Sequence, residues 1–173
     1  LARNNIVNGV DDWLCALHQV ETLDLSSNSL KALPACIIDL AELRDLNARR
    51  NHLASVAMLA AMPWLTSIDV GYNYLDDLFD FGNATALTTL SASVNNLHAI
   101  PESLCLATML VTLDLSNNKF EGSVPDCFGT DLRKLERINF GGNPLLTALP
   151  SSMAGLVSLT ELLLSDGGIN ELP

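Results

Sequence analysis

Apolar and polar residues alternate over short stretches of this chain, and the same stretch returns along its whole length. Two leucines separated by one residue are followed, three positions later, by an asparagine and then by another apolar residue. The clearest copies are Leu23-x-Leu25-x-x-Asn28-x-Leu30 and Leu113-x-Leu115-x-x-Asn118-x-Phe120. The asparagines recur every 22 to 25 residues, as Asn28, Asn51, Asn73, Asn95, Asn118 and Asn143. Alternation with a period of two predicts a short strand in each copy, with every second side chain facing a core.

A second apolar pattern follows most copies, and a proline often stands at its start. Examples are Leu33-Pro34-x-x-Ile37-x-x-Leu40-x-x-Leu43 and Leu149-Pro150-x-x-Met153-x-x-Leu156. No single copy can bury its own leucines, so neighbouring copies must stack and share one continuous core. We expect this core to be closed by Val20, Leu30, Leu33, Ile37, Leu40 and their equivalents in the other copies.

The complete frame, L-x-x-L-x-L-x-x-N-x-L, resembles that of the leucine-rich repeat family, and the resemblance covers the whole chain. It implies an α/β solenoid, a curved horseshoe with a parallel sheet on the concave side and helical or irregular returns on the convex side. About eight coils are expected, two of them partial. The first partial coil is Leu1-x-x-Asn4-x-Ile6, and the last coil carries Gly167 in place of the asparagine.

The repeated asparagines are interpreted as structural residues and not as ligands. A side-chain amide at a chain bend can bond backbone groups that neither strand nor helix satisfies. Stacked coils would line these amides into a ladder, which is the local role that asparagine favours at turns.

Residues 1–173 are expected to form a single repeat domain. The chain begins inside a frame at Leu1 and stops at Leu172-Pro173, where another return should start. Because open solenoid ends need polar caps, we expect a fragment of a longer chain that lacks its caps.

The style of the repeats favours a cytoplasmic setting, with a cell-surface or extracellular one as the alternative. Most copies look like the typical repeat of intracellular scaffolds of the Ras-regulator kind. One copy, from Asn118 to Pro125, resembles the N-x-F-x-G-x-I-P segment of plant receptor ectodomains. That segment occurs only once.

Composition narrows the range of partners. The formal net charge is −11, which makes a nucleic acid an unfavourable partner and favours a protein partner with a basic or mixed surface. The longest apolar run, Val56 to Leu65, is interrupted by Pro63 and is well short of the ~20 residues of a membrane-spanning helix. We therefore expect no membrane insertion in this segment.

The four cysteines repeat one offset. Cys15 and Cys36 flank equivalent buried positions one coil apart, and Cys105 and Cys127 do the same. Each pair would lie on neighbouring convex coils, where a bridge requires alpha carbons within about 7 Å of each other. Two interpretations stay open: two disulfides, or four free and partly buried cysteines.

Asn83-Ala84-Thr85 is a glycosylation sequon on a predicted return segment that faces solvent. A chain rich in asparagine can also acquire such a sequon by chance, so Asn83 is only a candidate site.

Catalytic and metal-binding patterns are not recognisable. His18, His52 and His98 fall at different repeat phases and cannot cluster. The acidic group at Asp76, Asp77 and Asp80 lacks the glycine and the terminal glutamate of a calcium loop. We therefore predict a chain that is not an enzyme and needs no metal or cofactor.

The repeat phase identifies the side chains that point outward from the concave sheet, and most of them are small and polar. Arg49, Arg50 and Tyr72 fall on adjacent coils, and arginine and tyrosine are enriched at binding hot spots. The alternative is that the arginines only pair with aspartates across the strands. The residues expected on the partner-binding face are Asp45, Asn47, Arg49, Arg50, Asp69, Tyr72, Asp114 and Arg137.

The resulting functional hypothesis is a scaffold or adaptor module that binds a protein partner on its concave face. One alternative is the ligand-binding ectodomain of a secreted or cell-surface receptor. A second alternative is the regulatory repeat region of a multidomain signalling enzyme.

Overall fold

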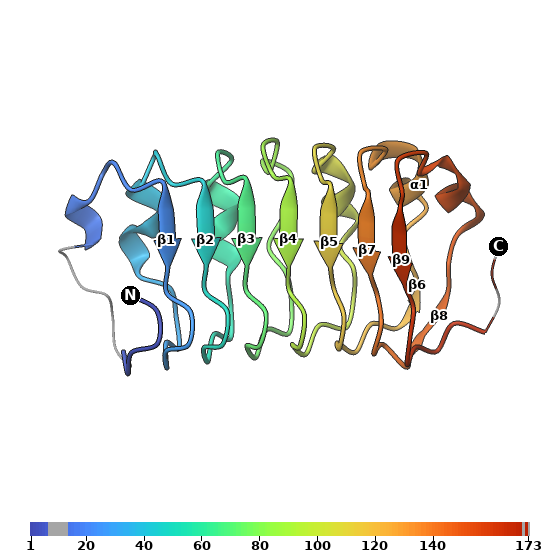
Figure 1. Ribbon diagram of the computed structural model, residues 1–173, viewed down its shortest axis with the longest axis horizontal. Helices are drawn as coiled ribbons and strands as arrows, with labels where there is room; N and C mark the ends of the chain where they lie inside the picture. Colours follow the sequence, from blue (N-terminus) through green and yellow to red (C-terminus); the bar gives the residue numbers. More distant parts are fainter. Residues whose placement is uncertain (7–13, 171, 173) are drawn as a thin grey trace.

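The computed structural model describes residues 1–6, 14–170 and 172, without the side chain of Cys15, and it forms an open solenoid (Figure 1). Within these residues, seven short parallel strands make one sheet in the order β1-β2-β3-β4-β5-β7-β9. Their bounds are β1 Thr22–Asp24, β2 Asp45–Asn47, β3 Ser67–Asp69, β4 Thr89–Ser91, β5 Thr112–Asp114, β7 Arg137–Asn139 and β9 Glu161–Leu163. Equivalent residues stand side by side, as Leu23 does with Leu46 and Leu46 with Ile68. The predicted solenoid of stacked coils is thereby confirmed.

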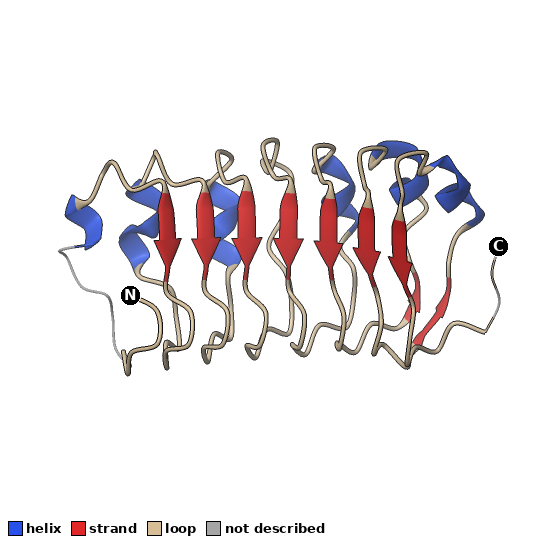
Figure 2. Cartoon of the chain, in the orientation of Figure 1, coloured by secondary structure: helices blue, strands red, loops and turns tan. Residues whose placement is uncertain are grey.

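Short helices form the second layer, behind the sheet (Figure 2). They are the 3₁₀ helices η1 Leu14–Ala16, η2 Ala35–Asp39, η3 Ala57–Ala61, η4 Glu102–Leu106 and η5 Ser151–Gly155, and the α-helix α1 Cys127–Asp131. Pro34, Pro101 and Pro150 directly precede η2, η4 and η5, with φ between −60° and −73°. The proline ring imposes this φ and removes a backbone donor, so each proline ends the preceding extended segment where the helix begins.

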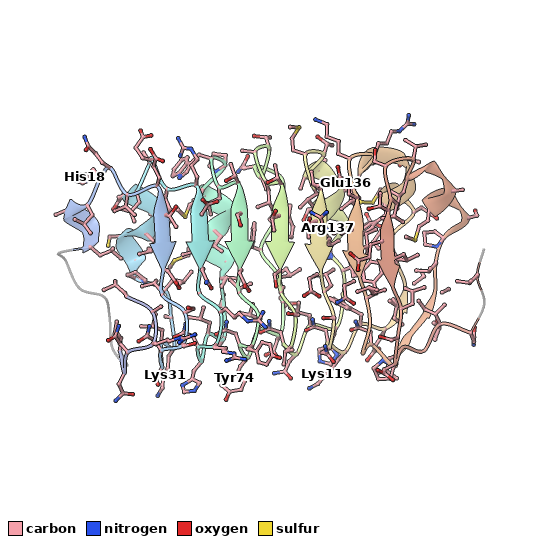
Figure 3. All side chains as sticks on the ribbon, in the orientation of Figure 1. His18, Lys31, Tyr74, Lys119, Glu136 and Arg137 are labelled. Carbon is pink, nitrogen blue, oxygen red and sulfur yellow. A yellow bond between two sulfur atoms is a disulfide. The ribbon has the colours of Figure 1, made fainter. Side chains whose placement is uncertain are left out.

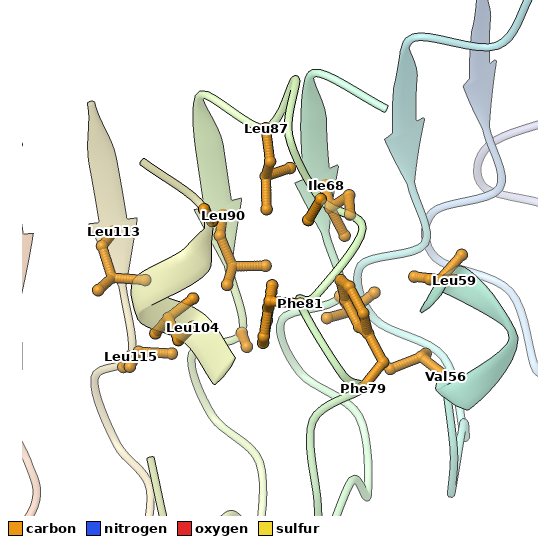
Figure 4. Close-up of a cluster of buried hydrophobic side chains, with 14 of the residues drawn as sticks. Val56, Leu59, Ile68, Phe79, Phe81, Leu87, Leu90, Leu104, Leu113 and Leu115 are labelled. Atoms are coloured by element: carbon orange, nitrogen blue, oxygen red, sulfur yellow. The ribbon is translucent and has the colours of Figure 1, made fainter. Parts of the chain in front are cut away.

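The return between β3 and β4 contains neither helix nor strand. Phe79 and Phe81 fill the space behind these strands, with ring centroids 4.2 Å apart, and both are almost fully buried. Figure 4 shows the two rings among Leu59, Leu90 and their neighbours. Two aromatic side chains therefore supply the apolar volume that a helical return provides in most other coils.

A second sheet of two strands lies on the later coils. It pairs β6 (Gly122–Ser123) with β8 (Leu146–Ala148), and Gly122 has a φ of 75° that favours glycine. Strand β6 belongs to the segment that resembles plant receptors. Its partner β8 follows Asn143 in the next coil, which has no glycine of that kind.

The core follows the predicted alternation. Leu23 and Leu25 are 5% and 0% exposed, whereas Asp24 between them is half-buried on the outer face. One continuous cluster of buried side chains runs from Leu14 to Leu156. The face of the sheet that points away from the helices is hereafter called the concave face.

The asparagine ladder joins each coil to the one before it. Asn95 accepts a hydrogen bond from the Leu75 N–H at 3.0 Å and donates to the carbonyls of Val70 and Ala92 at 3.1 and 3.0 Å. Leu75 and Val70 belong to the preceding coil, and Ala92 belongs to the same coil as Asn95. The equivalent amides bond in the same manner, and all are at most 8% exposed: Asn28, Asn51, Asn73, Asn118 and Asn143.

Candidate partner-binding face

The side chain of the third residue in most sheet strands accepts a hydrogen bond from the backbone N–H two residues later, across the bend that follows the strand. Asn47 accepts the Arg49 N–H at 3.1 Å, Asp69 accepts the Gly71 N–H at 2.9 Å, and Asp114 accepts the Ser116 N–H at 3.1 Å. Short polar side chains favour this local bond at turns. Three residues expected to contact a partner therefore also hold the bend at the end of their strands.

Asp24 is the third residue of β1 and accepts hydrogen bonds from Ser26 in the same way. Burial raises the pKa of its carboxyl, but hydrogen bonds from the Ser26 hydroxyl and N–H lower it, as do the positive charges of the N-terminus and Arg3. The net effect is a pKa below the ordinary value of 3.8.

Arg49 and Arg50 both contact one tyrosine ring on the next coil. Their guanidinium carbons lie 4.4 and 5.1 Å from the centroid of the Tyr72 ring, which is 40% exposed. Arg49 also lies 3.8 Å from a carboxylate oxygen of Asp69. Stacking of this kind contributes about 0.5–1 kcal/mol at an exposed site. Arg49 therefore both pairs with an aspartate across the strands and lies over the Tyr72 ring, and its partner-binding role stays a prediction. Arg49, Arg50 and Tyr72 are hereafter called the arginine–tyrosine cluster.

Gly71 makes the arginine–tyrosine cluster geometrically possible. A Cβ built on Gly71 would lie 2.8 Å from Arg49 Nη1 and 3.1 Å from the Asp69 carboxylate. Any larger residue would therefore require the end of the Arg49 side chain to shift. The absence of a side chain at Gly71 thus leaves room for Arg49 to lie along the concave face.

The residue directly before each ladder asparagine adopts a left-handed backbone. At this position φ lies between 53° and 71° in residues Arg3, Ser27, Arg50, Tyr72, Val94, Asn117, Gly142 and Asp166, the first and last of which precede Asn4 and Gly167 in the end coils. Glycine, asparagine and aspartate tolerate this conformation, whereas bulky and β-branched side chains do so at a cost of about 1–3 kcal/mol. Three successive coils nevertheless carry Arg50, Tyr72 and Val94. Strained residues of this kind concentrate at functional sites.

Two hollows lie beside this column, at the edge where the strands end. The larger, of about 430 Å³, is lined by Arg50, Asn51, His52, Tyr72, Asn73, Tyr74 and Val94. The smaller, of about 340 Å³, is lined by Lys31, His52, Ala54 and Tyr74. His52 and Tyr74 line both hollows and stack on each other, with ring centroids 5.6 Å apart and planes inclined by 20°. Figure 3 shows Lys31 and Tyr74 along this edge, below the strands.

The remaining predicted contact residues are distributed along the sheet. Asp45 begins β2 and lies near the hydroxyls of Thr22 and Thr66. Arg137 lies on β7, where it donates to the Thr112 hydroxyl at 2.9 Å and pairs with Glu136 at 3.7 Å. Asp114 stands on the neighbouring strand, β5. These last two residues lie on β7 and β5, whereas the arginine–tyrosine cluster follows β2 and β3.

Sequence reasoning missed Lys31, His52, Tyr74 and Val94 as site residues. A usable signal was present, because His52 and Tyr74 both directly follow a ladder asparagine in successive coils. Residues at the same repeat phase in adjacent coils become neighbours once the coils stack. The left-handed position of Val94 could not be read from the residue type, since valine avoids positive φ.

The convex side carries the cysteines and the sequon. Cys105 and Cys127 form a disulfide between η4 and α1, with alpha carbons 5.8 Å apart. Cys36 is also disulfide-bonded, and the side chain of Cys15 lies outside the described residues. Asn83 and Thr85 are exposed on the return that has no helix, and the Asn83 amide makes one long contact, 3.4 Å to the Ala60 carbonyl.

Neither a membrane-spanning helix nor a cluster of metal ligands is present among the described residues. No helix in that part of the chain has the length and apolar character needed to cross a bilayer. Nor do histidines, cysteines and carboxylates gather there in threes or more as metal ligands. The histidines are spread out: His52 stacks on Tyr74, whereas His98 lies 3.8 Å from Glu121.

Comparison with known proteins relates the chain to repeat proteins. A family model described as leucine rich repeat matches residues 1–53 and 108–169. Tsukushi of Mus musculus is 33% identical over 178 residues, which cover 100% of this chain and 44% of Tsukushi. The chain thus spans less than half the length of this relative.

Solved structures agree with the sequence matches. A leucine-rich repeat protein of Leptospira interrogans superposes with a TM-score of 0.93 at 26% identity, over 99% of this chain and 43% of that protein. The leucine-rich repeat ectodomain of a plant membrane receptor kinase from Arabidopsis thaliana, solved in complex with Casparian strip integrity factor 2, gives a TM-score of 0.83 at 28% identity. That alignment covers 94% of this chain and 20% of the ectodomain. The family match, the register of the strands and the asparagine ladder lead to one conclusion: this chain belongs to the leucine-rich repeat family.

Proposed function

We propose that this chain is a non-enzymatic binding module that docks a protein partner on its concave face, around Arg49 and Tyr72. The observation that carries the proposal is the left-handed column, in which Arg50, Tyr72 and Val94 occupy positions that glycine or asparagine would fill with less strain. The Arabidopsis ectodomain, which was solved with a bound factor, supports binding as the role of the fold.

The chemistry of the cluster suits an anchor at the centre of an interface. The Tyr72 ring offers a rigid aromatic face with few rotatable bonds, and the two guanidinium groups offer directed donors around it. The cluster is already assembled in the free chain, so a partner would order few side chains when it binds.

The proposal is tested by removing the anchors. Proteins that bind the immobilised chain are first identified from a panel of secreted proteins and receptor ectodomains, and their dissociation constants are then measured. The double variant Arg49→Ala with Tyr72→Ala should weaken binding by more than ~2 kcal/mol, which is a factor of about 30. Its melting temperature should fall only slightly, because Tyr72 is exposed and the Arg49–Asp69 pair is only half-buried.

A matched control is Arg133→Ala, since Arg133 is an exposed arginine in the return between α1 and β7. This variant should bind each partner as the wild type does. If the double variant and the control bind equally well, the interface lies elsewhere.

We further propose that the chain works outside the cell, as part of a ligand-binding ectodomain, and not in the cytoplasm as the repeat style had suggested. Disulfides persist mainly in oxidising compartments, and the Cys105–Cys127 bridge joins two coils on the convex side. The similarity to a membrane receptor ectodomain supports the same setting. The Asn83 sequon is accessible on that convex side.

Secretion from eukaryotic cells tests this setting. The secreted chain should lose about 2–3 kDa on treatment with peptide-N-glycosidase, as expected for one core N-glycan. Thr85→Ala should abolish this change while Thr88→Ala should not, because only Thr85 completes a sequon. A secreted chain that carries no glycan and four reactive thiols would exclude the extracellular proposal.

A further inference from the structure

The edge formed by Lys31, Arg50, His52, Tyr72 and Tyr74, hereafter the Tyr74 edge, combines exposed aromatic rings with positive charge. We propose that it binds an acidic segment of the protein partner, in which carboxylates flank an apolar side chain. This inference rests on the proposed function, because it assigns the chemistry of one part of the same interface.

The aromatic part of the edge exposes apolar surface on two neighbouring coils. Tyr74 is 57% exposed and Tyr72 is 40% exposed, although both belong to well-packed coils. The stacked His52–Tyr74 pair stands between the two hollows and lines both of them. An apolar side chain of a ligand could enter either hollow and pack against this pair, burying aromatic surface that now faces water.

The charge of the edge is opposite to that of the whole chain. Acidic residues outnumber lysine and arginine by 20 to 9, yet the two hollows are lined by Lys31 and Arg50 and by no carboxylate. Within the described part of the chain, neither of these two cations lies within 4.0 Å of a carboxylate oxygen. A carboxylate of a ligand would therefore meet an uncompensated positive charge at each hollow.

Arg50 and Tyr72 occupy this edge although their backbone has the left-handed conformation that large side chains disfavour. Both have φ near 55°, and the equivalent residues of the other coils are Arg3, Ser27, Val94, Asn117, Gly142 and Asp166. Since Ser27 and Gly142 satisfy the fold at this position, the turn itself does not require the bulk and charge of Arg50 and Tyr72. A ligand-binding role accounts for these two residue types.

Peptide is a better match for this edge than the other anionic ligands. A nucleic acid could stack a base on Tyr74, but it carries a phosphate at every nucleotide, and the edge offers only Lys31 and Arg50 to compensate them in a chain of net charge −11. A sulfated glycan would satisfy Lys31 and Arg50 and could stack a sugar ring on Tyr74, but it would place no apolar side chain in either hollow. An acidic peptide with an aromatic or aliphatic residue satisfies both features at once.

Selection from a random peptide display library tests the inference. The wild-type chain should enrich peptides in which aspartate or glutamate brackets an aromatic or aliphatic residue. The charge-reversed variant Lys31→Glu with Arg50→Glu should bind a selected peptide ten- to a hundredfold more weakly. A fresh selection on this variant should enrich lysine and arginine in place of acidic residues.

The matched control reverses two exposed cations elsewhere, as Arg133→Glu with Lys134→Glu, and produces the same change in net charge. It should bind the selected peptides within twofold of the wild type. Both charge reversals lie on exposed side chains, and the thermal unfolding of each variant should match that of the wild type. Equal loss of binding in the two variants would mean a general electrostatic effect, which overturns the inference.

Three further outcomes separate this inference from the proposed function. If the selected peptides lack acidic residues, the inference about the edge is overturned. So does tight binding of heparin by a chain that selects no acidic peptide, because the edge would then be a glycan site. If Arg49→Ala with Tyr72→Ala abolishes partner binding while the reversed edge has no effect, the concave site stands and the edge inference fails.

Discussion

The ladder asparagines should couple neighbouring coils, and Asn95→Ala measures that coupling. The Asn95 side chain is the hydrogen-bond partner of the Leu75 N–H, while the carbonyls of Val70 and Ala92 also accept from the ladder amides of adjacent coils. Truncation therefore leaves the Leu75 N–H without a partner, and each carbonyl keeps one donor. An orphaned buried N–H costs about 1–3 kcal/mol, and the weakened carbonyl bonds add about 1 kcal/mol.

We therefore expect Asn95→Ala to lower the free energy of unfolding by about 2–4 kcal/mol, measured by urea denaturation with an unchanged m-value. The neighbouring Asn96 is only partly buried and makes no side-chain hydrogen bond within the described structure, so Asn96→Ala is a suitable control. That change should stay within about 0.5 kcal/mol of the wild type. Equal stabilities for the two variants would refute the interpretation of the ladder as a coupling between coils.

Two other changes probe the turn residues. Val94→Asn should raise the free energy of unfolding by about 1 kcal/mol, because asparagine tolerates the φ of 56° that valine does not; lower stability in urea denaturation would contradict the strain at Val94. Asp24→Asn tests the lowered pKa of Asp24. Because the folded chain holds this carboxyl ionised more strongly than the unfolded chain does, Asp24 stabilises the fold above pH 3.8. That stabilisation is lost as the pH falls through the pKa of Asp24 in the folded chain. The difference in melting temperature between the wild type and Asp24→Asn should therefore narrow below pH 3.8, and a constant difference from pH 3 to 7 would rule this out.

The parts of the structure predicted from the sequence are those that every coil repeats. One apolar frame determined which side of each strand faces the core, and Leu23 and Leu25 are buried as expected. The same phase predicted that Arg49, Arg50 and Tyr72 would be neighbours, because parallel strands in register bring equivalent residues together.

The parts that were not predicted depend on single coils. The return that contains Phe79 and Phe81 has no helix, and the sequence pattern does not distinguish a bulky aromatic filler from a helical turn. Strand β6 lies in the plant-like segment, but its partner β8 lies in a coil without the glycine of that motif. The motif alone therefore did not predict their pairing. The stack of His52 on Tyr74 depends on side-chain rotamers, which repeat phase does not specify.

The binding role of the concave face is tested most directly by hydrogen–deuterium exchange on the chain with and without a bound partner. Amides that follow β2 and β3, in residues 48–53 and 70–75, should exchange more slowly in the complex. Those of the convex helices η4 and η5 should exchange at unchanged rates. Protection confined to the convex helices, with no change at 48–53 and 70–75, would contradict a partner site at the arginine–tyrosine cluster.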